Sequence, residues 1–118
     1  MKTGHTGIKR IIYATGYSIK GLKAAWHNEA AFRQEGVAAV VLITLSFFLP
    51  VTKLEQLAMI GSIALILIAE LMNSAIEAVV DRISDEHHEL SGRAKDIGSA
   101  AVFIALAFAA FTWGFILI

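Results

Sequence analysis

The sequence predicts an all-α membrane protein, with one amphipathic surface helix and three membrane-spanning helices. Hydrophobic residues make up 57% of the 118-residue chain, whose mean hydropathy is +0.67. Charged residues make up 17%, below the roughly 25% of a typical soluble domain. Residues 97–118 contain no charged side chain, and this run exceeds the roughly 18 apolar residues that indicate a membrane-spanning helix. We therefore expect residues 1–118 to form one membrane domain.

The other two spans each contain charged residues near one end. Residues 57–69 are uncharged but too few to cross a bilayer, so we expect a helix over about 55–80 that includes acidic side chains. Residues 37–51 are also uncharged, and this span is expected over about 30–50. Arg33 and Glu35 would then reach toward the interface or face protein. The turn between these two spans is expected around Pro50.

Residues 8–26 have the pattern of a helix that lies in the membrane interface. At 100° per residue one stripe of this segment is apolar, and the basic residues lie off it. The stripe contains Ile8, Ile11, Ile12, Ile19, Leu22 and Trp26. An amphipathic helix packed on a soluble core has the same pattern, but this chain offers no soluble core to receive it. Gly16 and Gly21 lower the helix propensity of the segment.

The distribution of basic residues predicts the orientation in the membrane. Six of the ten precede the first uncharged run, three lie between the second and third spans, and only Lys53 lies between the first and second. Basic residues favour the cytoplasmic side of a membrane. We therefore expect the N-terminus and a loop over residues 81–96 in the cytoplasm, and the C-terminus on the opposite side.

Composition excludes several classes of function. The formal net charge is zero and no arginine-rich or lysine-rich run is present, so nucleic acid is not an expected partner. The absence of cysteine excludes a zinc–thiolate site and a thiol nucleophile. No Walker motif is present either, because Leu22 stands where the P-loop spacing of Gly16 and Gly21 requires a lysine.

Acidic and amide side chains share one face of the second span. Glu70, Asn73 and Glu77 fall on this face at helical spacing, and Asp81 follows at its cytoplasmic end. An ionised carboxylate at the centre of a span costs about 2.5–3.5 kcal/mol, so the stripe must face protein, water or metal. Two interpretations remain: a site for protons or a divalent metal such as Mg²⁺ with phosphate, or a polar seam that only joins helices.

Three helices of a single chain hardly enclose a site, so a homo-oligomer would supply the missing wall. Small residues that permit close helix contacts support this expectation weakly. They are Gly61, Ala69, Ala75, Gly98, Ala101, Ala105 and Ala109. Glu29, at the junction of the surface helix and the first span, could serve either as a charge at a helix N-terminus or as a metal ligand with Glu77.

The segment 81–96 is highly charged, and a solvated loop is its default interpretation. Lys95 and Asp96 stand just before the uncharged third span, where backbone N–H groups and a lysine could bind phosphate. His87 and His88 are adjacent and lack the His-Glu-x-x-His spacing of a zinc hydrolase.

Three motifs together closely resemble the bacterial membrane diacylglycerol kinases. They are NEAAFRQE at 28–35, ELMNSAIEAVVD at 70–81 and HELSGRAKDIGSAA at 88–101. The resemblance covers nearly the whole chain. It implies a homotrimeric enzyme of the bacterial inner membrane that transfers the γ-phosphoryl group of MgATP to the hydroxyl of diacylglycerol, giving phosphatidic acid and ADP.

The resemblance also implies roles for individual residues. Glu70 matches the candidate general base, Asn73 another active-site residue, and Glu29 and Glu77 the ligands of the divalent metal that holds ATP. The nucleotide is expected to contact Arg10, Tyr17, Glu29, Glu77, Glu86, His88, Lys95 and Asp96. The lipid is expected near Arg10, Ala14, Trp26, Ala31, Arg33, Glu70 and Ser99.

Two other functions remain open at this point. A related family, the undecaprenol kinases, shares the Glu, Asn and Lys-Asp motifs. Acidic residues within spans are equally expected in an oligomeric proton or ion pathway without enzymatic activity.

Overall fold

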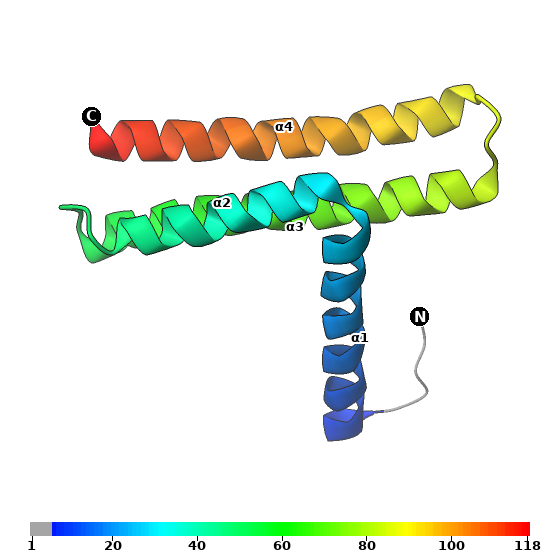
Figure 1. Cartoon of the computed structure of the whole chain (residues 1–118), viewed down its shortest axis with the longest axis horizontal. Coiled ribbons are helices and arrows are strands. Elements are labelled where there is room, and N and C mark those ends of the chain that lie inside the picture. Colours follow the sequence, from blue (N-terminus) through cyan, green and yellow to red (C-terminus); the bar gives the residue numbers. More distant parts are fainter. Residues whose placement is uncertain (1–5) are drawn as a thin grey trace.

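The computed structural model describes residues 6–118 and consists of four helices joined by short connections (Figure 1). They are α1 (Gly7–Asn28), α2 (Ala30–Ser46), α3 (Lys53–Ile83) and α4 (Glu89–Leu117). The predicted all-α class is confirmed. Both α3 and α4 are long and apolar enough to cross a membrane.

Helices α2, α3 and α4 lie side by side in alternating directions, and α1 runs crosswise to them (Figure 1). The central helix of this arrangement is α3, which packs against both α4 and α2. Because α2 and α3 are joined by a short turn, they must be antiparallel neighbours.

The turn between α2 and α3 stops one helix and starts the next. The N–H groups of Phe47 and Phe48 bond to the carbonyls three residues earlier, at 3.2 and 2.9 Å, which tightens the end of α2. Thr52 then caps α3, because its hydroxyl accepts a bond from the Glu55 N–H and the Glu55 carboxylate accepts one from the Thr52 N–H. The helix α2 consequently ends at Ser46, four residues before its expected boundary.

The expectation of a loop over residues 81–96 is wrong in extent. The helix α3 continues to Ile83 and α4 begins at Glu89, so only residues 84–88 separate them. Charged side chains are compatible with a helix whose surface is solvated, and Glu89 pairs with Arg93 one turn later at 3.5 Å. His88 caps α4 by accepting the Leu90 N–H at its Nδ1, at 3.0 Å.

This shift of the helix boundary changes the interpretation of Lys95 and Asp96. They lie in the second turn of α4, so the free N–H groups at the start of that helix are not beside them. The structure therefore does not support phosphate binding by a helix N-terminus at these two residues. Any contact of Lys95 with phosphate would come from its side chain, which pairs with Asp81 in this structure.

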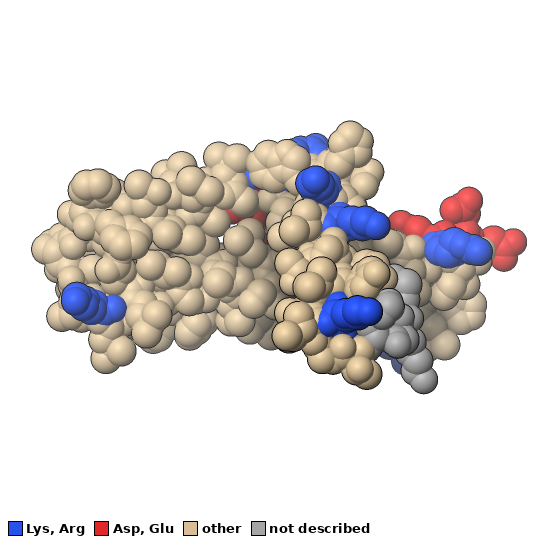
Figure 2. Space-filling model, turned by 90° about the horizontal axis from the view of Figure 1, so that it is seen from below, with Lys and Arg blue, Asp and Glu red and all other residues tan. Residues whose placement is uncertain are grey.

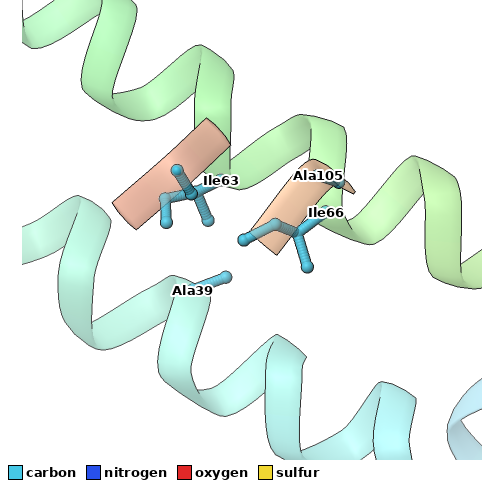
Figure 3. Packing of buried hydrophobic residues seen from close by; sticks show 5 residues of the cluster. Ala39, Ile63, Ile66 and Ala105 are labelled. Carbon is cyan, nitrogen blue, oxygen red and sulfur yellow. The ribbon is translucent and has the colours of Figure 1, made fainter. Parts of the chain in front are cut away.

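Small and branched side chains build the core where the three long helices meet. Ile63 and Ile66 of α3 contact Ala39 of α2 and Ala105 of α4 (Figure 3), and Ala109 completes the cluster. The small residues Gly98, Ala105 and Ala109 are thus buried within the chain, where they let α3 and α4 approach closely. Other small residues proposed for self-association, Gly61, Ala75 and Ala101, stay exposed.

A group of hydrogen bonds joins the helices at the end opposite to the 84–88 connection. The Trp113 indole Nε1 of α4 donates to the Met59 carbonyl of α3 at 3.2 Å. Gln56 of α3 donates to the Ser46 hydroxyl of α2 at 3.3 Å. Met59 and Ser46 are almost completely buried, so these bonds act where water cannot compete.

Replacing Trp113 by Phe should lower the free energy of unfolding by about 0.6–1.7 kcal/mol, the range for polar contacts between membrane helices. The change removes the donor to Met59 and keeps an aromatic ring. Reversible unfolding in mixed detergent–SDS micelles measures the effect. Phe103→Leu is the control, because Phe103 is exposed on α4 and should change stability much less. Equal losses in the two variants would contradict the assigned hydrogen bond.

Candidate active site

The inner face of α3 becomes polar just beyond the apolar core. Glu70 lies four residues after Ile66 and is buried, with only 6% of its surface exposed. Asn73 and Glu77 follow on the same face and are partly buried. The carboxylates of Glu77 and Glu29 lie near enough to that of Glu70 for electrostatic interaction, and the Asn73 side chain is within hydrogen-bonding range of Glu70. Several acidic groups therefore meet in one place.

Glu29 is the single residue that separates α1 from α2, and it forms the corner between them. Its backbone is extended, with φ −117° and ψ 106°, so it interrupts the helix and turns the chain. The Glu29 N–H still bonds to the Ala25 carbonyl at 2.9 Å. Its carboxylate accepts a bond from the Ser74 hydroxyl of α3 at 3.3 Å. The corner thus directs Glu29 at α3, less than one turn from Glu77.

Arg33 stabilises this corner from the first turn of α2. Its guanidinium donates to the carbonyls of Trp26 and His27, at 2.8 and 3.1 Å. These carbonyls belong to the last turn of α1 and have no partner further along that helix. The guanidinium supplies their hydrogen-bond donors and places a positive charge at the negative end of the helix dipole. Trp26 in turn packs within 3.4 Å of the position that a Cβ at Gly36 would occupy.

Gly98 of α4 is the counterpart of Asn73. A Cβ at Gly98 would overlap the Asn73 Oδ1 and lie 3.7 Å from the Asn73 Cα. Only glycine lets the amide occupy this space between α3 and α4. The Oδ1 atom is buried and has no hydrogen-bond partner among the described residues, which leaves an acceptor free at this point.

Glu35 is a polar residue of this region whose electrostatic interaction with Glu70 the sequence did not predict. It is partly buried on α2, and its charge interacts with that of Glu70. The sequence left two options for Glu35, the interface or protein, and the structure selects the second. The sequence does contain a sign of this burial, because Glu35 lies one helical turn before Ala39 on the helix face that also contains Phe32.

A second polar region lies at the connection between α3 and α4. Lys95 Nζ pairs with the Asp81 carboxylate at 2.7 Å. The two residues contribute to a pocket of about 260 Å³. Its other lining residues are Val80, Ser84, Asp85, Glu86, His87, His88, Ser91 and Gly92. Charged side chains gather at this end of the molecule and over α1, while most of the remaining surface in Figure 2 is uncharged.

The structure does not bring the first half of α1 to the acidic cluster. Arg10, Ala14 and Tyr17 are exposed and share one face of a helix that projects away from α3 (Figure 1). Ala31 is exposed at the start of α2, and Ser99 is exposed on α4 beside Gly98. Asp96 is also exposed. One chain therefore contains the acidic part of the predicted site, while several of the other predicted residues face outward.

An open groove separates α1 from α3 and leads to Glu29. Its volume is about 670 Å³, and its lining is mostly small or apolar. The lining residues are Ser18, Gly21, Leu22, Ala24, Ala25, Asn28, Glu29, Leu71, Ser74, Ala75 and Ala78. Such a lining suits an alkyl chain or another helix better than a charged ligand.

The donor set is suited to a metal that arrives with phosphate. Among residues 6–118, no three acidic or histidine side chains lie close enough together to hold an ion by themselves. Mg²⁺ is usually bound through one or two carboxylates, with phosphate oxygens and water completing its shell. Glu29 and Glu77 fit that pattern.

Comparison with known proteins extends over almost the whole chain. The prokaryotic diacylglycerol kinase family matches residues 16–117. The chain belongs to this family. Over 113 residues it is 58% identical to the diacylglycerol kinase of Escherichia coli strain K12. The aligned region covers 96% of this chain and 93% of that protein.

Two further relatives have the same name and similar coverage. The diacylglycerol kinase of Haemophilus influenzae is 56% identical over 112 residues, covering 95% of both chains. That of Pseudomonas aeruginosa is 55% identical over 115 residues, covering 98% of this chain and 94% of the relative. The resemblance inferred from the three motifs is confirmed.

Gly98→Ala should lower the kinase kcat by roughly tenfold to a hundredfold, since a displacement of about 1 Å at a site has an effect of this size. The added methyl group would push Asn73 away from Glu70. Initial-rate assays in mixed micelles measure kcat. Gly114→Ala on the same helix is the control, because nothing lies within 4 Å of its Cβ position. Unchanged kcat in Gly98→Ala would refute the assigned role of this contact.

Proposed function

We propose that this chain is a diacylglycerol kinase that transfers the γ-phosphoryl group of ATP to the hydroxyl of diacylglycerol, giving phosphatidic acid and ADP. The observation that supports this most strongly is the family match over almost the whole chain, in a protein whose long apolar helix α3 carries the buried Glu70 and the other residues of the acidic face. A lipid hydroxyl at a membrane surface and a nucleotide from water can meet at such a place.

The proposal includes a multi-pass arrangement in the bacterial inner membrane, with α2 as the third span. The 17 helical residues of α2 and the two tightened residues after it extend about 28 Å, close to the roughly 30 Å of a hydrocarbon core. The charge distribution favours a cytoplasmic N-terminus and 84–88 connection, with a periplasmic C-terminus. The acidic cluster would then lie near the cytoplasm, which contains ATP.

Glu70 is proposed as the general base. Its carboxylate is buried between helices and would accept the proton of the lipid hydroxyl as the oxygen attacks phosphorus. The free Oδ1 of Asn73 would orient a donor at the same place. Phosphoryl transfer needs mainly positioning and charge neutralisation, so this small set of groups is sufficient without a P-loop.

Glu29 and Glu77 are proposed to hold Mg²⁺ together with the ATP phosphates. When bound, the ion neutralises phosphate charge during transfer. Lys95 would contact the same nucleotide, as would the neighbouring Asp96, and the 260 Å³ pocket lined by Lys95, Glu86 and His88 would accept another part of the molecule. In this arrangement the lipid end and the nucleotide end of the site lie along one face of α3.

A homotrimer is proposed to complete the site. The helix α1 projects away from the other three helices (Figure 1), and its residues Arg10 and Tyr17 are exposed, so a neighbouring protomer would bring them to the nucleotide. The groove between α1 and α3 is also open and mostly apolar. Lipid would approach along α1 and α4, past Ala14, Trp26, Ala31, Arg33 and Ser99.

The purified protein in mixed micelles should convert ATP to ADP only when diacylglycerol is present, with formation of radiolabelled phosphatidic acid. Undecaprenol, tested in parallel, should be a poor acceptor. Phosphorylation of undecaprenol alone would replace the proposed substrate. No ATP turnover with either lipid, together with proton flux in liposomes, would indicate a conduction pathway.

The role of Glu70 is tested in the same assay. Glu70→Gln should lower kcat by at least about a hundredfold, because general-base catalysis contributes roughly 10²–10⁴. Its KM for MgATP should change little, since the nucleotide is held elsewhere. Full activity of this variant would refute the proposed base.

Glu29→Gln and Glu77→Gln should each raise the Mg²⁺ concentration for half-maximal activity by at least roughly tenfold. Even residues that only hydrogen-bond to a metal ligand change metal affinity by this much. A Mg²⁺ titration at fixed ATP measures the shift. Glu89→Gln is the control, because this exposed carboxylate pairs with Arg93 on the surface of α4. A shift of equal size in all three variants would contradict the metal assignment.

A further inference from the structure

Glu35 has a buried carboxylate oxygen that the proposed reaction does not yet use. Its Oε2 atom is inaccessible to water and has no hydrogen-bond partner among residues 6–118. No basic side chain in the described part of the chain forms an ion pair with Glu35. The nearest arginine, Arg33, is engaged by the carbonyls of Trp26 and His27. A buried carboxylate oxygen without a hydrogen-bond partner destabilises the fold, so this arrangement requires an explanation.

The register of α2 against α3 places Glu35 in the same layer as Glu70. Ala39 of α2 and Ile66 of α3 belong to one buried cluster. Glu35 lies four residues before Ala39, and Glu70 lies four residues after Ile66. Because the two helices are antiparallel, both steps are one turn in the same direction. The two residues therefore lie in one layer on the adjoining helices α2 and α3, and the charge of Glu70 acts on that of Glu35.

Two carboxylates in one water-poor layer repel each other unless they share a proton. A proton on the Glu35 Oε2 would turn an unsatisfied acceptor into a donor, with the Glu70 carboxylate as its acceptor. Before MgATP binds, the other charged groups around the pair do not remove this need. Glu29 and Glu77 add negative charge, and Lys95 is paired with Asp81.

We propose that Glu35 is a positioning residue that holds the Glu70 carboxylate in orientation by a hydrogen bond through a shared proton. The inference rests on the proposed kinase function and adds a residue to it. One oxygen of Glu70 accepts from Glu35, and the other is left free to face the lipid hydroxyl. The orientation of the base is thereby set before the substrate arrives.

The reaction balances with this pair. The lipid O–H bond breaks, and its proton moves to the free oxygen of Glu70. The hydroxyl oxygen forms a bond to the γ-phosphorus, while the bond from that phosphorus to the β,γ-bridging oxygen breaks and its electron pair leaves with ADP. The pair then holds two protons and no charge, and it returns one proton to water after the products depart.

The test compares two substitutions of similar size. Glu35→Gln retains a donor, because the amide N–H can bond to Glu70, whereas Glu35→Met retains the volume and has none. We expect kcat of Glu35→Gln to stay within about threefold of wild type. That of Glu35→Met should fall roughly tenfold to a hundredfold, with KM for MgATP and for diacylglycerol nearly unchanged. Gln34→Ala, an exposed neighbour on α2, is the control and should match wild type.

Equal kcat values in the Gln and Met variants, whether high or low, would overturn the inference. Wild-type protein without diacylglycerol-dependent turnover would instead overturn the proposed function, so the two failures are distinguishable.

A second measurement does not depend on activity or on the stability of the Met variant. The infrared spectrum of the wild-type protein should contain the C=O band of a buried protonated carboxyl group, and Glu35→Gln should lose it. Persistence of the band in Glu35→Gln, or its absence from wild type, would also overturn the inference.

Discussion

The antiparallel register between α2 and α3 is the constraint on which the acidic cluster depends. Ala39, Ile63 and Ile66 fix this register by close packing, since a small residue on one helix receives branched side chains from the other. The next layer toward the charged end contains Glu35 and Glu70. Their carboxyl groups are therefore withheld from lipid by the same contacts that join the two helices.

The corner at Glu29 connects this cluster to the amphipathic helix α1. One extended residue ends α1 and starts α2, and Arg33 holds the two helices at that angle through the last carbonyls of α1. The hydrogen bond from the Ser74 hydroxyl follows from this corner, since it holds the Glu29 carboxylate against α3. A helix without this break would carry Glu29 away from Glu77, and the pair could not serve one metal.

Small residues have two different uses in the chain. Gly98 gives space to the Asn73 amide inside the α3–α4 interface, while Ala75 lines the open groove beside α1. Within the chain, small size permits a polar side chain to approach the acidic cluster. On the outside it leaves space that another helix or an acyl chain can occupy. The sequence alone treats these residues alike, because it does not show which face of each helix meets a neighbour.

Periodicity and hydropathy in the sequence determined that the chain is helical and membrane-bound, and that Glu70, Asn73 and Glu77 share a face, because these depend only on residues close in sequence. The motifs determined the family. Only the tertiary structure decided that α3 and α4 continue through most of residues 81–96, and that Glu35 lies in the same layer as Glu70. These features depend on caps and on packing between helices, where the partner of a side chain is set by register and not by its neighbours along the chain.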